Sequence, residues 1–174
     1  MTVNTIGRKT LLKYTAISVV TILFLLTVVV LIFGQGTDVP MTLGRVLGTY
    51  KDEFIKNVDF VAIQIILTLV TIWYVGGLCG QLIIKKGKNK FIIGGLSILT
   101  LWVSLFIGSA LTAGVINSIK YAGLGFTSAI ESWLIYGLIP FLFFGLVHGL
   151  IIGFPLGREI KKSGEKLNAL QQSA

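Results

Sequence analysis

The sequence predicts an all-α integral membrane protein, a four-transmembrane-helix bundle with both chain ends on the cytoplasmic side (N-in/C-in). Of its 174 residues, 54% are hydrophobic and 13% are charged, whereas about 25% of residues are charged in a typical soluble domain. The apolar residues gather in four runs of 20 to 26 residues. About 20 such residues form a helix long enough to cross the hydrocarbon core of a bilayer.

The four expected transmembrane helices occupy about residues 14–33, 60–84, 91–116 and 133–154. Each is expected to be helical because backbone N–H and C=O groups have no water to bind in lipid. The first run follows a basic segment, as a signal peptide does, but it is twenty residues long. A signal core has roughly 7–15 residues, so we expect the run to be retained. Residues 1–162 make one membrane domain, and 163–174 a polar cytoplasmic tail.

The Lys and Arg residues indicate the orientation of these helices. Eleven of the fifteen lie before the first run, between the second and third, or after the fourth, and the other two connections hold four. Cytoplasmic loops are enriched in basic residues, so this positive-inside pattern predicts that both ends are inside. The formal charge of +8 therefore reports orientation, and no nucleic-acid partner is expected. We expect a multi-pass protein of the bacterial inner (cytoplasmic) membrane.

The first outer connection carries an apolar stripe with helical spacing, from Leu43 through Leu47 and Phe54 to Val58. Charged residues lie between these positions, so the segment is expected to form a short amphipathic helix near the membrane surface. Thr49, three residues before Asp52, is its expected N-terminal cap. The alternative is that the second membrane helix simply begins early, at Tyr50.

Two further patterns concern helix starts and an internal repeat. Ser128 followed by Glu131 fits the capping box that opens a helix, so the fourth helix is expected to begin near Ser128. Similar positions recur at offsets of 77 to 79 residues, for example Lys13 with Lys90 and Gly80 with Gly157. A duplicated two-helix hairpin produces such offsets, and so does any four-helix chain with even connections.

Glycines recur every fourth residue in the fourth helix, a pattern called a glycine zipper: Gly145, Gly149, Gly153 and Gly157. Helices associate in lipid largely through close backbone packing, which small residues permit. The row therefore predicts a tight helix contact. Its partner is a helix of this chain, of another copy or of another protein, and a pore-lining or hinge role is the remaining alternative.

Small and polar residues mark faces of two other helices. Ser97, Ser104 and Gly108 share a face of the third helix, and Gln64 lies on the second. Such residues usually serve packing and interhelical hydrogen bonds. The alternative is a polar path for an ion or a small solute, which requires that the faces of Gln64 and Ser104 meet at water.

Ionisable residues near or within the membrane are candidates for function. His148 lies inside the fourth run, but no carboxylate lies deep in any run to partner it, so a structural role is expected. Asp59 and Glu131 flank outer helix ends and are candidates for a shallow cation site, or else a solvated end and a capping carboxylate. Pro140 is expected to kink the fourth helix.

The sequence lacks the motifs of common catalytic sites. It contains no CxxC, HExxH, GxSxG or phosphate-binding loop, and the one cysteine, Cys79, lies in an apolar run. We therefore expect no enzyme activity, no cofactor and no metal. The expected function is that of a small membrane subunit or scaffold acting through helix contacts with another membrane protein or with copies of itself. The alternative is a homo-oligomeric channel or transporter for an ion or small solute.

Overall fold

The computed structural model describes residues 2–33, 42–120 and 126–172, except for the side chains of residues 26, 33, 120, 129, 136 and 139–144. All regular structure in these ranges is helical, which confirms the predicted all-α class. Two of the elements, η2 and η3, are single π-helical segments. In chain order the elements are α1 (Val3–Phe33), α2 (Leu43–Lys56), α3 (Val58–Gly80), η2 (Gln81–Lys85), α4 (Lys90–Lys120), α5 (Phe126–Ser132), η3 (Trp133–Gly137) and α6 (Leu138–Gln172).

Within the described residues, three helical segments are long and apolar enough to cross a membrane: Val3–Ile32, Val58–Lys85 and Lys90–Ile119. They contain the first three predicted runs and confirm the character of a membrane protein. The first segment begins well before residue 14, because Ile6 and Leu11 on its early turns are buried in the core. The hydroxyl of Thr2 accepts a hydrogen bond from the N–H of Thr5 (3.3 Å) at the start of this helix.

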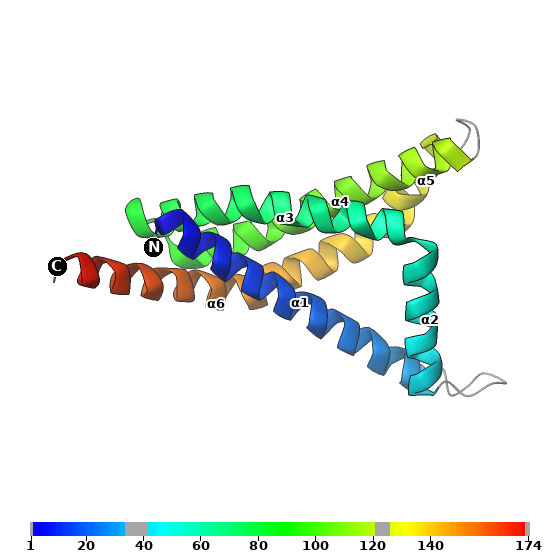
Figure 1. Ribbon diagram of the computed structural model, residues 1–174, viewed down its shortest axis with the longest axis horizontal. Coiled ribbons are helices and arrows are strands. Elements are labelled where there is room, and N and C mark those ends of the chain that lie inside the picture. The colour runs from blue at the N-terminus through cyan, green and yellow to red at the C-terminus, as the bar shows by residue number, and fades with distance from the viewer. Residues whose placement is uncertain (1, 34–41, 121–125, 173–174) are drawn as a thin grey trace.

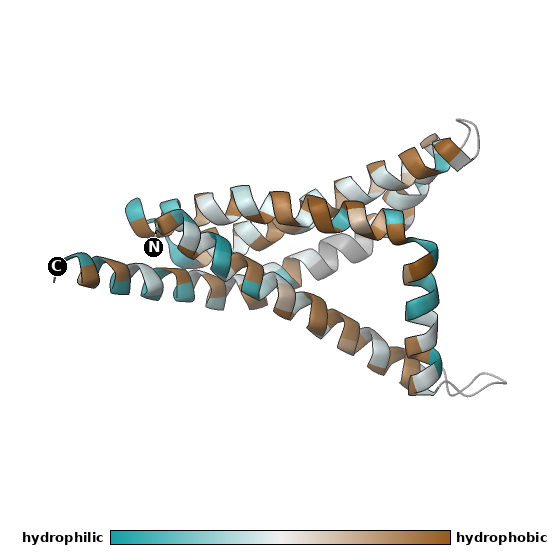
Figure 2. Cartoon of the chain, viewed as in Figure 1, coloured by the Kyte–Doolittle hydropathy of each residue, from teal (hydrophilic) through white to brown (hydrophobic). Residues whose placement is uncertain are grey.

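The helices converge at one end of the molecule and diverge at the other (Figure 1). Both chain ends and the connection between η2 and α4 lie at the converging end, here called the terminal end; α2 and α5 lie at the other, called the α2 end. Figure 2 shows hydrophilic residues gathered at the terminal end and on α2, and hydrophobic residues along the helices between. Most of the buried core lies toward the terminal end: Ile6, Leu11, Ile72, Cys79, Ile83, Ile98, Leu101, Leu156 and Ile160.

The first connection contains a separate helix, α2, which bridges the diverging ends of α1 and α3 (Figure 1). Its N-cap is Thr42, whose hydroxyl accepts from the N–H of Arg45 at 3.4 Å. Thr49, the predicted cap, is in fact in the helix interior, where its hydroxyl donates to the carbonyl of Arg45. The break at Asn57, whose side-chain amide donates to the carbonyl of Glu53, separates α2 from α3. The second membrane helix therefore does not begin at Tyr50.

Glycines allow two pairs of helices to cross with backbones in contact. A Cβ atom at either Gly7 or Gly94 would overlap a carbonyl group of the facing helix. In the part of the chain that the structure describes, Gly7 of α1 crosses Gly76 and Gly80 of α3 in this way, and Gly94 of α4 crosses Gly153 and Gly157 of α6. Each pair is antiparallel, so α1–α3 and α4–α6 form two hairpins.

The two hairpins repeat one packing pattern. The carbonyl that faces the later glycine belongs to Val3 in the first crossing and to Lys90 in the second. Equivalent positions differ by 87 residues in α1 and α4, and by 77 in α3 and α6. The predicted offset of 77 to 79 is therefore correct for Gly80 and Gly157 but wrong for Lys13 and Lys90, because the first hairpin contains a connection longer by ten residues.

The last part of the chain lies along the whole of α4. A Cβ at Gly114 would meet Phe126, one at Gly137 would meet Phe106, and one at Gly145 would meet Trp102. α5 begins at Phe126, close to the predicted start near Ser128, but Ser128 lies in its first turn and is therefore not its N-cap. The π-helical segment η3 directly precedes α6, whose third residue is Pro140.

The predicted polar tail is helical as far as Gln172, because α6 continues through Pro155. Its last turns pack at the terminal end. Gly164 is buried with its Cα facing the side chain of Ile84 in η2, and Leu167 packs against the core. The tail thus extends the helical bundle beyond the fourth apolar run.

Candidate functional site: helix contacts within the bundle

The glycine row of α6 faces α4, with a clear gradient of closeness. At Gly153 and Gly157 an added Cβ would overlap backbone atoms of Gly95 and Lys90. At Gly149 the nearest atom to such a Cβ is the carbonyl oxygen of Gly95, at 3.5 Å, which is ordinary van der Waals contact. At Gly145 it is the Cβ of Trp102, at 3.6 Å. The glycine row of α6 therefore packs against a helix of the same chain, and the two backbones approach most closely toward the terminal end.

The small and hydroxyl residues of α4 lie in contacts between helices. Ser97 is 5% exposed and donates its hydroxyl to the carbonyl of Ile93, at 2.8 Å, within its own helix. A Cβ at Gly108 would meet Leu67 of α3 at 2.7 Å. Ser104 is half-buried. A hydroxyl that donates to a carbonyl of the preceding turn has its hydrogen-bond donor satisfied within its own helix, without a partner helix or water.

Gln64 joins α3 to α4. Its amide Nε2 donates to Thr112 Oγ1 at 3.3 Å, and the hydroxyl of Thr112 donates in turn to the carbonyl of Gly108 at 2.7 Å. The other amide atom, Oε1, is buried and has no hydrogen-bond partner among the described residues. A buried acceptor left without a donor costs about 1–3 kcal/mol. Gln64 is thus held by one interhelical bond, with one unsatisfied atom.

His148 of α6 packs beside Trp102 of α4, with their ring centroids 5.5 Å apart and the rings tilted by 48°. Its side chain is half-buried. The histidine therefore belongs to the same α4–α6 contact as the glycine row, one residue before Gly149.

The structure places Asp59 and Glu131 at the α2 end, both exposed. Phe60 and Trp133, close to them in sequence, lie near one another with ring centroids 6.4 Å apart. Among the described residues, however, no group of three His, Cys, Asp or Glu side chains is arranged to hold a metal ion.

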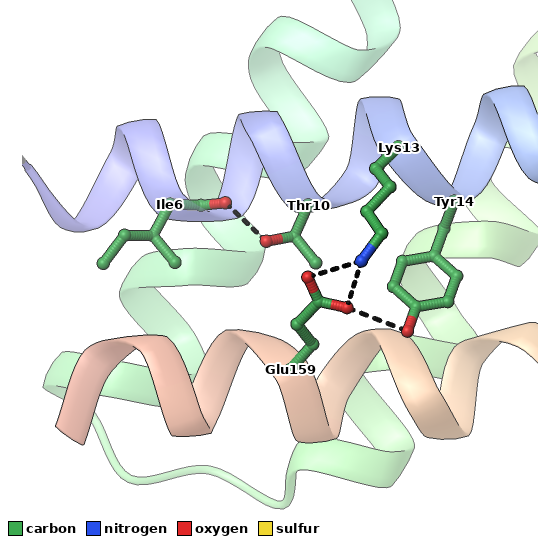
Figure 3. Close-up of polar contacts among 5 residues, drawn as sticks. All are labelled: Ile6, Thr10, Lys13, Tyr14 and Glu159. Carbon is green, nitrogen blue, oxygen red and sulfur yellow. Dashed lines mark hydrogen bonds and ion pairs between the residues drawn. The ribbon is translucent and has the colours of Figure 1, made fainter. Parts of the chain in front are cut away.

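A polar cluster that the sequence analysis did not single out joins α1 to α6 (Figure 3). Lys13 Nζ lies 2.9 Å from both carboxylate oxygens of Glu159, and the hydroxyl of Tyr14 donates to Glu159 Oε2 at 3.0 Å. Burial alone would raise the pKa of Glu159, but the bonds from Lys13 and Tyr14 outweigh it and hold that pKa below its usual range. In the structure Glu159 lies between Leu156 and Ile160, which are both buried in the core.

A second missed contact joins α1 to α3. Arg8 Nε donates to the carbonyl of Trp73 at 2.9 Å, and the guanidinium lies 3.6 Å from the centre of the Trp73 ring. From the sequence, Arg8 was expected only to contribute to the positive-inside pattern. A cation over an aromatic ring is stabilised by the ring's electron density, most strongly over Trp.

Comparisons of the chain with protein-family models, curated proteins and solved structures found no match. Glu159, Gln64 and the glycine row each hold one helix of the chain against another. At the terminal end α1 is held against α3 and α6, and toward the α2 end it separates from them (Figure 1). The helices α3 and α4 and the α5–η3 segment stay in contact at the α2 end.

Proposed function

We propose that the chain is a non-enzymatic membrane subunit or scaffold that crosses the bilayer four times, N-in/C-in, and acts through helix contacts. The fourth crossing is supported by the course of α5, η3 and α6, which lie antiparallel along the whole of α4, itself long and apolar enough to span. The orientation is supported by the basic terminal end. In this topology α2 lies near the outer membrane surface, with exposed Leu43, Leu47 and Phe54 available to lipid.

The main support for the proposal is that the polar residues considered for a solute path make hydrogen bonds and packing contacts with other helices or with their own helix. Gln64 bonds to Thr112, and Gly108 lies against Leu67, so the α3 and α4 faces meet as packed helices. Hydroxyls of α4, such as that of Thr100, bond to carbonyls of their own helix. This use of polar residues favours packing over transport.

The surface left for a partner is the half of α1 nearer the α2 end. Ser18 is the last buried residue along α1 among the described side chains, whereas Val20 and Phe24 are 67% and 66% exposed. About 14 further residues, or roughly 21 Å of helix, therefore have few neighbours within the chain. Helix association in lipid comes largely from packing, so a transmembrane helix of another chain would supply the contact that this half lacks.

A photo-crosslinking residue at Phe24 tests this proposal in intact membranes. Ile151 of α6 is the matched control, because it is equally apolar and 67% exposed. We expect a discrete protein adduct from position 24 and lipid adducts alone from position 151. An adduct of twice the 18.9 kDa chain mass identifies a second copy as the partner, and another discrete mass identifies a different protein. Lipid adducts alone from both positions would contradict the proposal.

One observation favours the alternative, a homo-oligomeric channel. Gln64 Oε1 is buried without a partner among the described residues, and a carbonyl oxygen in that state can take a cation or water. The two accounts differ for Gln64→Leu in proteoliposomes. A channel predicts ion flux in the wild type that this substitution abolishes, whereas the subunit proposal predicts no flux above protein-free vesicles in either protein.

A further inference from the structure

Two adjoining cavities lie beside the α4–α6 contact, toward its terminal end. One is an apolar groove of about 400 Å³ between α4 and α6, whose lining includes Gly95, Leu96, Gly149 and Leu150. The other, of about 250 Å³, lies at the η2–α4 connection and is lined by Lys88, Lys90 and Lys161. Phe91 lines both cavities, so the groove and the basic cavity lie next to one another.

The matched hairpin shows why the groove is open. The position of Gly95 corresponds to Arg8 in α1, and that of Leu150 corresponds to Trp73 in α3. In the α1–α3 hairpin the Arg8 side chain fills the space, with its guanidinium over the Trp73 ring and its Nε facing Gly77. In the α4–α6 hairpin glycine replaces the arginine, and Leu150 is 77% exposed. The two hairpins therefore share one backbone packing, but the space beside the crossing is filled by a side chain in α1–α3 and is left as a groove in α4–α6.

The basic cavity carries charge that its lining does not neutralise. Its lining residues include three lysines and no carboxylate. Glu165 reaches Lys161 at 3.8 Å, in a pair whose two side chains are more than half exposed. The ammonium of Lys90 lies 4.9 Å from the centre of the Phe91 ring, at the junction with the groove. The cavity thus offers cationic donors where the apolar groove begins.

We propose that this surface binds one anionic phospholipid, with its phosphate against Lys88, Lys90 and Lys161 and one acyl chain in the groove. The order of the two parts fits a lipid, because charge lies at the helix ends and the groove runs from there toward the membrane centre. From Phe91 to Leu99 the groove follows about 12 Å of helix, most of one leaflet of a hydrocarbon core about 30 Å thick. Basic pockets between membrane helices are suited to such head groups.

Spin-labelled phosphatidylglycerol and phosphatidylcholine test the proposal on the full chain in phosphatidylcholine vesicles. The measurement is the fraction of each lipid that the protein immobilises. We expect a preference of at least fivefold for phosphatidylglycerol, which weakens with added salt. The variant K88Q/K90Q/K161Q is expected to lose this preference, since each lysine contributes on the order of fivefold. The control K85Q/K86Q/K162Q removes equal charge at exposed positions outside the cavity and is expected to keep it.

The groove is tested separately by Gly95→Leu, which fills it. A Cβ at Gly95 lies 3.4 Å from the nearest atom, the carbonyl oxygen of Gly149, so the fold is expected to survive, and circular dichroism checks this. We expect less immobilised lipid of both kinds. Inorganic phosphate at matched ionic strength is expected to compete only weakly, because it lacks an acyl chain.

Three results would overturn the proposal. One is no preference for phosphatidylglycerol in the wild type. Another is an equal loss of the preference for phosphatidylglycerol in the two triple variants, which would show a general attraction of anionic lipid to a basic surface. The third is a protein adduct, in place of lipid, from a photo-crosslinker at Leu96, which would make the groove a helix interface.

Discussion

The substitution Gly153→Ala should destabilise the bundle far more than Gly149→Ala, although the two glycines lie one turn apart on the same helix. An added Cβ at Gly153 would overlap the backbone of Gly95 and lie 2.8 Å from the carbonyl carbon of Gly94. At Gly149 the nearest atom is 3.5 Å away. Backbone atoms cannot rotate aside as a flexible side chain can, so α4 and α6 must separate in the first variant only.

The loss of stability expected for Gly153→Ala can be estimated from the distance by which α4 and α6 must separate. Moving the Gly95 nitrogen from 2.5 Å to an ordinary distance of 3.4 Å requires a shift of about 0.9 Å. A gap of 0.5–1 Å forfeits roughly a quarter to a half of each atom pair's attraction of about 0.1–0.2 kcal/mol. For a crossing with on the order of 40 such pairs, the loss is roughly 1–4 kcal/mol, in line with the cost of about 1–3 kcal/mol for overpacking a tight contact. For Gly149→Ala we expect less than about 0.5 kcal/mol.

Reversible unfolding in mixed detergent micelles measures this difference, with oligomer size followed in parallel. Val28→Leu in α1, a change at a half-buried position far from both crossings, is a further control. We expect only Gly153→Ala to lower the unfolding midpoint, with no change in oligomer size, because the crossing is internal. Equal midpoints for both alanine variants would refute the argument from backbone contact, and dissociation of an oligomer would place the crossing between chains.

Three other predictions concern polar residues. The Lys13–Glu159 pair is partly exposed, so it should add no more than about 1 kcal/mol to the free energy of unfolding. Because folding lowers the pKa of Glu159, this contribution is full above about pH 4.3 and is lost as the pH falls through the pKa of the folded state. Unfolding midpoints measured from pH 6 to 3 should therefore fall more steeply for the wild type than for Glu159→Gln. Gln64→Leu should leave stability unchanged or raise it, because it removes the unsatisfied Oε1 while Thr112 keeps its bond to Gly108. A lower unfolding midpoint would show that the Gln64–Thr112 bond stabilises the fold by more than the unsatisfied Oε1 costs. His148→Gln should leave the helical content and midpoint nearly unchanged, and a collapse of either would give the histidine a larger role than packing beside Trp102.

The helical class and the first three membrane segments could be predicted because they depend on composition and length, which a single sequence contains. Helix ends were less accessible. Thr49 and Ser128 have the residue types of caps, but the actual helix starts are at Leu43 and Phe126. A capping residue is favourable only where the chain turns, and that turn is set by contacts far away in sequence.

The contacts were predictable only in part for a related reason. A row of glycines is visible on α6, but its partners Gly94 and Gly95 form no such row, and Gly7 stands alone in α1. Glu159 is one charge in a basic segment until Lys13 is brought beside it. Pairings between helices depend on register and crossing angle, and single-helix periodicity contains neither.

The number and direction of crossings is the central claim, and site-directed labelling of single cysteines tests it most directly. In a Cys79→Ser background, cysteines placed at Lys51, Lys88, Ser128 and Asn168, all exposed in the structure, are treated in intact cells with a membrane-impermeant maleimide. The account predicts labelling at positions 51 and 128 from outside, and at 88 and 168 only after lysis. Labelling of positions 128 and 168 from the same side would show that α6 does not cross the membrane, and would contradict the four-helix topology.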